Sequence, residues 1–451
     1  MRLYRYPGVL FLILISLAPA FAQNYVPFTD DEEQIFTWKK LTYNRFVKDS
    51  INAKGEHKKE IQKQFRERYE TVKEIFTDKE CVSDPEADKY LQQIVKKIIQ
   101  NNPELNAHEP RIYFSRSANP NAYSCGEGSI FFNFGLVSKL KNESQMAFVL
   151  CHELAHYYLD HGNKRIIDNV NTFNSKELKK EIKKISRSEY QQNKKFGELV
   201  TSMIFKNSRY TRTQESAADS VGFIFFSKTD FDPKEVLETL NLLDSTEVER
   251  INMESILRKW FSFPEHPFKD SWVKKSSAFF GGPVSSLTKA QQDSLKTHPD
   301  CQLRRKALEP QVQKLSKTGS QFLIDEQLFR KLTLRSQYDL VEFLLKEESI
   351  SACLYFSMQL LEQYPTDPWL IGTVGECFNR LYKHQKAHTL GTVVSLPNPE
   401  GLKEYNVLLE FIQRVRLDDL SALSKYFLEK NKGTASNERL DNAMDKNKSL
   451  N

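Results

Sequence analysis

The stretch Val149-Leu150-Cys151-His152-Glu153-Leu154-Ala155-His156 decides how the segment around it folds. Its apolar residues are placed to anchor a helix in a hydrophobic core and to hold the polar residues rigid. Asn142 is a good N-cap for this helix, and Gln145 completes a capping-box pattern. Gly162 lies where a helix C-terminal stop is expected. The sequence therefore predicts one helix of about five turns between Asn142 and Gly162.

Two histidines on this helix are spaced to share a metal ion. His152 and His156 lie four residues apart, so both imidazoles project from one face of the helix. Glu153 is rotated by about 100° from His152, so its carboxylate can reach a metal-bound water without binding the metal. Two neutral imidazoles leave most of the charge of a zinc ion in place, and the pKa of its bound water falls towards neutrality. A chance occurrence of this spacing in an ordinary helix is the alternative, and a third ligand argues against it.

The third ligand is expected downstream, on a second helix. Glu215 and Asp219 lie four residues apart with two alanines between them, which lets this helix approach the first closely. Glu215 would complete three protein ligands and leave a fourth position for water, as in catalytic zinc sites. Asp219 can accept a hydrogen bond from a liganding imidazole and fix its tautomer. His161 lies nine residues after His152 and is expected to face away, as a surface or packing histidine.

With these motifs in place, the sequence resembles the zinc endopeptidases that include the HtpX-like proteases and the CAAX prenyl endopeptidases. The resemblance covers about residues 84–310 and rests on four blocks: Asn121-Ala122-Tyr123, His152 to His156 with His161, Arg212-x-Gln214-Glu215-x-x-Ala218-Asp219, and Thr297-His298-Pro299 with Arg304. It implies one zinc ion per chain, bound by His152, His156 and Glu215, with Glu153 as general base. It also implies that Asn121, Ala122 and Tyr123 hold the substrate in an extended form, which favours unfolded or flexible segments.

The resemblance gives the block around His298 a role close to the chemistry. His298 is expected near the open metal position, either as a plug in the resting enzyme or as a donor to the developing oxyanion. Arg304 belongs to the same block and is expected to support the ligands. A second His-Pro pair, His266-Pro267, makes His266 the alternative within this chain.

The N-terminus predicts export. Arg2 and Arg5 precede an apolar run, and Ala20-Phe21-Ala22 is the pattern after which signal peptidase cuts. The run is too short to cross a bilayer, which takes roughly 20 residues. We expect a removable signal at residues 1–22 and a periplasmic location, with secretion as the alternative. No later stretch is apolar enough to span a membrane, so a peripheral association is the only membrane contact expected.

Composition limits the other partners and the cysteine chemistry. The net charge of +6 is spread over a chain of 451 residues, with no basic tract interleaved with aromatic residues. Nucleic-acid binding is therefore not expected. The six cysteines show no CxxC spacing, so a cysteine zinc site is not expected, and the sequence does not choose among disulfide pairings. Cys125 lies in the expected substrate strand, as a packing residue or half of a disulfide.

Periodicity predicts a mainly α fold with a small β-sheet. A helix is expected from Asp84, and short strands are expected at Arg111–Phe114 and Ser129–Phe132. We expect an α+β zincin-like peptidase domain followed by an α-helical repeat domain of the tetratricopeptide type. The boundaries follow composition: signal 1–22, N-terminal helical segment 23–80, zinc metallopeptidase domain 81–310, helical repeat domain 311–430 and disordered tail 431–451.

The repeat assignment rests on spacing. Pro365 and Pro399 lie 34 residues apart, the length of one tetratricopeptide-like helix pair. Two further pairs are expected at 329–364 and 402–428. An irregular helical bundle is the alternative, and a protein partner is expected on the helical face if repeats form.

These expectations describe an exported zinc metalloendopeptidase that acts on unfolded or misassembled envelope or secreted proteins. Similar periplasmic β-barrel assembly-enhancing proteases join this peptidase type to helical repeats. One alternative is a binding scaffold or chaperone whose zinc site is vestigial or structural. The intact Glu153 argues against it, because a structural site has no use for a base. A zinc hydrolase acting on non-peptide substrates is a weaker alternative.

Overall fold

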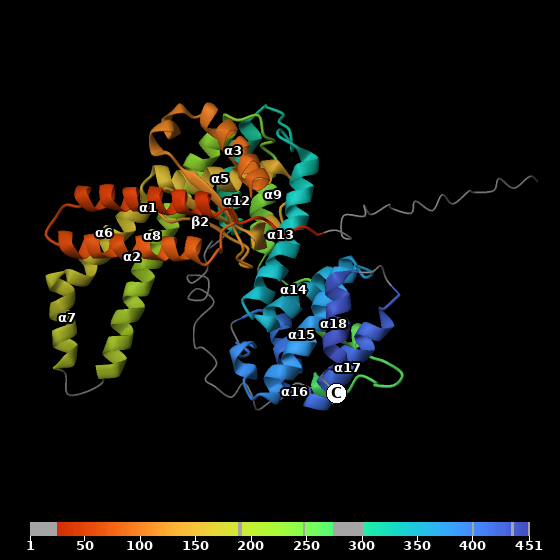
Figure 1. The fold of residues 1–451 in the computed structure, drawn as a ribbon. Coiled ribbons are helices and arrows are strands. Elements are labelled where there is room, and N and C mark those ends of the chain that lie inside the picture. Colours follow the sequence, from red (N-terminus) through yellow and green to blue (C-terminus); the bar gives the residue numbers. More distant parts are fainter. Residues whose placement is uncertain are drawn as a thin grey trace, which may run out of the picture.

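A computed structural model describes residues 25–187, 192–246, 249–273, 301–398, 401–433 and 437–449. The chain is mainly helical, with one small mixed sheet (Figure 1). The predicted signal at residues 1–22 lies outside the described residues. Within them, no helix is long and apolar enough to cross a membrane.

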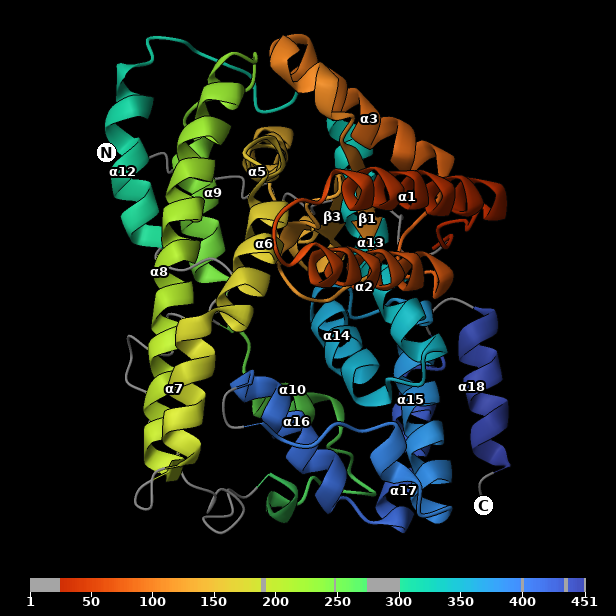
Figure 2. The ribbon, with the colours of Figure 1, turned by 90° about the vertical axis from the view of Figure 1, so that its left-hand side faces the viewer.

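Three helices precede the sheet. α1 (Glu32–Asn52) and α2 (Lys58–Thr77) form a hairpin, and α3 (Pro85–Gln100) follows (Figures 1 and 2). The side chain of Asp84 accepts hydrogen bonds from the backbone N–H groups of Glu86 and Ala87, so it caps α3. The helices that the sequence predicts here are confirmed.

The sheet has three short strands in the order β1-β3-β2. β1 (Arg111–Ser115) pairs in parallel with β3 (Ser129–Asn133), and β2 (Ala122–Ser124) pairs antiparallel with β3. The two predicted strands are therefore confirmed as β1 and β3. β2 lies in the loop between them and occupies one edge of the sheet.

α5 (Glu143–Tyr158) carries the two metal-spaced histidines and is buried along almost its whole length. Asn142 caps it by accepting a hydrogen bond from the backbone N–H of Gln145, as predicted. The prediction of a single helix up to Gly162 is wrong. Asp160 adopts a left-handed conformation with φ of 57°, so α5 ends and the chain turns before α6 (His161–Asn174) begins.

α8 (Gln192–Ser227) is the long helix that lies against α5, and α7 (Lys176–Ser186) runs beside it (Figure 2). α9 (Glu235–Ser245) follows α8 and also packs on α5. A short helix, α4 (Phe134–Val137), joins β3 to α5. These elements enclose the region that holds the predicted metal ligands.

The C-terminal part is an irregular helical bundle. Its helices are α10 (Met253–Trp260), α13 (Glu326–Lys346), α14 (Ile350–Gln363), α15 (Pro368–Lys386), α16 (Lys403–Arg414), α17 (Leu417–Lys430) and α18 (Glu438–Lys448), with 3₁₀ segments at Asp270–Trp272 (η3) and Leu390–Thr392 (η4). α12 (Cys301–Lys314) packs instead on α8 and α9, in the core around α5, and a further 3₁₀ segment, η2 (Pro103–His108), lies between α3 and β1. Between Pro365 and Pro399 the described chain holds α15 and η4, so the expected helix pair does not form there. α15 instead lies at the centre, against α14, α17 and α18. The alternative of an irregular bundle therefore describes this region, and tetratricopeptide-like repeats are not seen.

The prediction of a disordered tail is wrong for residues 437–449. They include α18, in which Leu440 and Ala443 are fully buried. The composition is polar, but a few apolar residues at helical spacing suffice to pack one face of a short helix on α15.

Two large cores share α13. Phe329, Leu332 and Leu340 join the core that surrounds α5, whereas Tyr338 and Val341 join the core of the C-terminal bundle. One helix therefore belongs to both hydrophobic cores. The domain boundary near residue 310 stays a prediction.

Candidate metal centre

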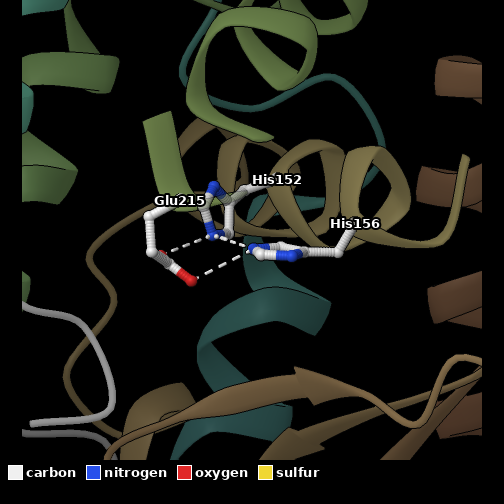
Figure 3. A group of neighbouring side chains, drawn as sticks. All are labelled: His152, His156 and Glu215. Atoms are coloured by element: carbon white, nitrogen blue, oxygen red, sulfur yellow. Dashed lines mark hydrogen bonds and ion pairs between the residues drawn. The ribbon is translucent and has the colours of Figure 1, made fainter. Parts of the chain in front are cut away.

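Three side chains from α5 and α8 point at one another (Figure 3). The Nε2 atoms of His152 and His156 lie 3.1 Å apart. Glu215 Oε1 lies 3.3 Å from His156 Nε2, and Glu215 Oε2 lies 3.5 Å from His152 Nε2. Donor atoms about 2.0–2.1 Å from a tetrahedral zinc ion are separated by about 3.3 Å. The two imidazoles and the carboxylate therefore fit zinc in both chemistry and spacing.

Small residues on α8 bring Glu215 to this position. Ala218 is fully buried, one turn from Glu215. At Gly222, a Cβ atom would lie 2.9 Å from the Cα of His152 and 3.0 Å from the carbonyl oxygen of Cys151. Because both neighbours are backbone atoms, only glycine permits this approach of α8 to α5. The pair of alanines in the sequence indicated the close packing, and Gly222 extends it by one turn.

Asp219 and Arg304 lie behind His152. Asp219 Oδ1 is 3.0 Å from Nδ1 of His152, so it favours the tautomer in which Nε2 is free for a metal. Arg304 donates two hydrogen bonds of 2.7 Å to the Asp219 carboxylate, and its Nη1 is 3.4 Å from Glu215 Oε2. Burial would raise the pKa of Asp219, but Arg304 and His152 together lower it to about 2. The structure thus brings Asp219 and Arg304 to the centre, where the sequence predicted them.

His161 belongs to the same centre, which corrects the sequence prediction. Its Nδ1 lies 2.9 Å from Nδ1 of His156. Burial, followed by the proximity of His156, lowers the pKa of His161 to about 4. A neutral His161 can accept a hydrogen bond from the Nδ1–H group of His156, which leaves Nε2 of His156 free for a metal. The prediction failed because it continued α5 past Asp160, where the backbone turns.

Glu153 lies on the side of α5 that faces β2. Its side chain is 3% exposed. Burial raises the pKa of Glu153 to about 7, against the lowering effect of His152 and of a hydrogen bond from the Ser124 backbone. A small pocket beside Glu153 is lined by apolar side chains of α4, α5 and α9 and by Ala122 of β2. Glu153 therefore lies between the metal ligands and the edge strand, as a base for a metal-bound water requires.

The remaining predicted residues fall in three places. Asn121 and Ala122 are buried at the start of β2, and Tyr123 is half-buried next to them. Their part in substrate binding stays a prediction. His266 lies in the C-terminal bundle, with its Nε2 3.1 Å from Asp419, so it is not at the metal centre. His298 lies outside the described residues.

The comparison with known proteins agrees with this geometry. Residues 85–312, about half of the chain, match the family described as peptidase family M48. No curated protein matches the chain. The matched segment contains His152, Glu153, His156, Glu215, Asp219 and Arg304. The chain therefore belongs to peptidase family M48, and the cluster of His152, His156 and Glu215 is the ligand set of a zinc metallopeptidase.

Proposed function

We propose that this chain is an exported zinc metalloendopeptidase that cleaves extended segments of unfolded or misassembled envelope or secreted proteins. The observation that carries the proposal is the buried Glu153 carboxylate, next to the three ligands and facing the edge strand. A purely structural metal site has no need of such a base. The arrangement therefore favours hydrolysis over a scaffold function.

Each residue of the centre has its own role in the proposed peptide hydrolysis. Zinc, when bound, polarises the scissile carbonyl and lowers the pKa of a coordinated water. Glu153 takes the proton of the attacking water and later gives it to the leaving amine nitrogen. Burial raises the pKa of Glu153, which helps it to hold the proton between the two transfers. Asp219 and His161 keep the two imidazoles oriented during the reaction.

The sheet edge supports an extended substrate. Among the residues that the structure describes, β2 pairs with β3 on one side only, and Ser124 donates its backbone N–H towards Glu153. An extended peptide can add to the other side of β2 through backbone hydrogen bonds. Such addition needs a flexible segment, which unfolded proteins expose and compact proteins do not. His298 is proposed to act near the open metal position, as a plug or as an oxyanion donor.

Export and a role in quality control rest on the signal pattern at residues 1–22 and on the resemblance to periplasmic proteases. A protein partner on the C-terminal bundle belongs to the same proposal. Cell fractionation with an antibody to the chain tests the location directly.

The test of the peptidase function compares zinc content with cleavage. The full chain without residues 1–22 is incubated with an unfolded protein, with and without a zinc chelator, and the fragments are mapped by mass. Glu153→Gln is expected to keep about one zinc per chain and to lose cleavage by at least about a thousandfold. Glu215→Ala is expected to lose both. Glu181→Gln, at an exposed site on α7, is the control and should change neither.

Near-normal cleavage by Glu153→Gln would show that the proposed mechanism is wrong. Absence of cleavage by the zinc-loaded wild-type chain would instead support the binding scaffold.

A further inference from the structure

The elements that line the metal centre continue past it into a second, larger cavity. The pocket beside Glu153 is lined by Leu136, Val149 and Leu243, among others. The second cavity, of about 500 Å³, is lined by residues of the same segments. Its lining includes Lys139 just after α4 and Gln145, which lies one turn before Val149 on α5. It also includes residues of α9 on both sides of Leu243.

The edge strand also leads into this cavity. Ala122 of β2 lines the pocket at the metal centre, and Ala118 and Pro120, just before β2, line the second cavity. Tyr355 and Phe356 of α14 close it from the C-terminal bundle. A peptide that extends along β2 beyond the reacting bond would therefore enter the cavity.

The charged side chains in the cavity are not balanced. Lys139, Lys141 and Arg250 line it. Lys139, Lys141 and Arg250 are all solvent-exposed, and the partial burial of Lys139, followed by the neighbouring Arg250 guanidinium, lowers the pKa of Lys139. Among the residues that the structure describes, neither Lys139 nor Arg250 forms an ion pair with a carboxylate. Two cations that repel each other in one cavity favour the binding of an anion.

The two carboxylates of the lining, Glu238 and Glu249, offset two of its three cations, so the lining keeps one net positive charge. Glu249 accepts a hydrogen bond from the hydroxyl of Tyr355 and others from the backbone N–H groups of Glu404 and Tyr405. These neutral donors leave the charge of Glu249 in place and direct its oxygens towards the C-terminal bundle. Glu238 is exposed on α9 and is the one lining carboxylate of the described chain without such partners. A substitution at Glu238 should consequently strengthen anion binding.

We propose that this cavity binds a carboxylate of the substrate peptide, from an Asp or Glu side chain or from a free chain end, through Lys139 and Arg250. The inference rests on the proposed peptidase function and names a substrate class for it. A carboxylate matches both cations in charge and hydrogen bonding. A peptide bound at β2 and in the cavity is held at two places, and binding remote from the reacting bond can be used to orient it.

A series of quenched fluorescent peptides tests the inference on the zinc-loaded chain. A neutral parent peptide carries a single Asp at successive positions on both sides of the cleaved bond. Each peptide is made with a C-terminal acid and with a C-terminal amide. Mass spectrometry confirms the cleaved bond, and kcat/KM is compared with that of the parent amide. We expect at least about fivefold higher kcat/KM for one position of Asp or for the free acid.

Variants assign the preference to the two cations. Lys139→Gln with Arg250→Gln should reduce the ratio to about one while the neutral parent is still cleaved. Lys139→Glu with Arg250→Glu should shift the preference to a peptide with Lys at the same position. Lys234→Gln, an exposed lysine next to α9 that does not line the cavity, is the matched control and should keep the wild-type ratio. Glu238→Gln should raise the ratio.

The outcomes separate this inference from the peptidase proposal. A preference for the free acid identifies the chain end as the source of the carboxylate, and a preference for Asp identifies a side chain. Equal cleavage of all peptides by the wild-type chain overturns the inference but leaves the peptidase proposal intact. A preference that survives in the Lys139→Gln, Arg250→Gln variant overturns it as well. Failure to cleave even the neutral parent contradicts the peptidase proposal itself.

Discussion

Each of the two imidazoles is oriented by a partner at its other ring nitrogen. Asp219, held by Arg304, lies at His152 Nδ1, and His161 lies at His156 Nδ1. Such partners fix the tautomer and the ring plane of a metal ligand, and their loss typically costs about 10–100-fold in metal affinity. The centre therefore has an inner set of three residues that would hold the metal and an outer set that orients the two imidazoles.

The first prediction at this scale concerns His161. His161→Phe keeps the ring volume and removes the nitrogen that faces His156, so we expect zinc affinity to fall by about tenfold or more. His161→Gln retains a polar group and should lose less. A competition titration with a chromophoric zinc chelator measures both. Equal affinity in the wild type and in His161→Phe would mean that the contact does not position His156.

Sequence spacing identified the ligands because each pair lies on a continuous helix. One helical turn separates His152 from His156, and likewise Glu215 from Asp219. This spacing can be read directly from the sequence. His161 follows a residue with positive φ, and nothing in the spacing announces that turn. The left-handed conformation of Asp160 is seen only in the structure, so the sequence could not place His161 beside His156.

At the scale of elements, the crossing of α5 and α8 decides whether the three ligands meet. Gly222→Ala would place a Cβ atom within about 3 Å of the backbone of His152. Because backbone atoms cannot move aside cheaply, we expect α8 to shift, zinc affinity to fall and stability to drop by about 1–3 kcal/mol. Thermal melting and the zinc titration measure the two effects.

Gly197→Ala on the same helix is the matched control, because a Cβ atom there meets nothing within 4 Å. It should be neutral or slightly stabilising, since alanine is the better helix former. If both substitutions behaved alike, the close approach at Gly222 would not be what sets the position of Glu215.

A second element-scale prediction concerns the cysteine pairing that the sequence left open. Cys353 on α14 and Cys377 on α15 are fully buried, with their Sγ atoms 3.5 Å apart. In the presence of glutathione disulfide, we expect the two thiols to lose two electrons and two protons and to form a disulfide, while the glutathione disulfide is reduced to two thiols. The bond closes a loop of 24 residues, which corresponds to about 3 kcal/mol of stabilisation.

Peptide mapping without reductant identifies the bond, and melting with and without reductant measures its effect. Cys151→Ala, which removes a buried cysteine of another core, should leave the redox-dependent difference in melting unchanged, and Cys377→Ala should abolish it. A map that shows both Cys353 and Cys377 as free thiols after oxidation would contradict the prediction.

At the scale of the whole molecule, the peptidase core and the C-terminal bundle are joined through α13. The buried carboxylate of Glu143, at the start of α5, accepts hydrogen bonds from the backbone N–H groups of Leu323, Ile324 and Asp325. Arg116, just after β1, forms a buried ion pair with Asp339 of α13. Composition placed a boundary near residue 310 because catalytic motifs end there. It could not show these contacts, since they join residues about 180 or more positions apart.

The last prediction tests whether the peptidase part is independent of the bundle. A chain that ends after Gln311 lacks α13, which leaves Arg116 without Asp339 and the Glu143 carboxylate without its three backbone donors. Removing one partner of a buried pair costs about 3–5 kcal/mol, which is a large part of the stability of a typical domain. We therefore expect this chain to unfold at room temperature or melt far lower, and to lose cleavage even of short peptides.

A point substitution separates the effect of losing these contacts with α13 from the effect of losing the whole bundle. Asp339→Asn in the full chain removes one of the two carboxylate charges beside Arg116, the other being Asp30, and we expect a destabilisation of about 1–3 kcal/mol in urea unfolding. Glu326→Gln, on the same helix, breaks the exposed pair with Arg330 and should cost less than about 1 kcal/mol. If the chain ending after Gln311 melts like the full chain and cleaves short peptides equally well, the contacts with α13 are dispensable for the peptidase part. The boundary near residue 310 would then hold, and the bundle would act on substrate recognition alone.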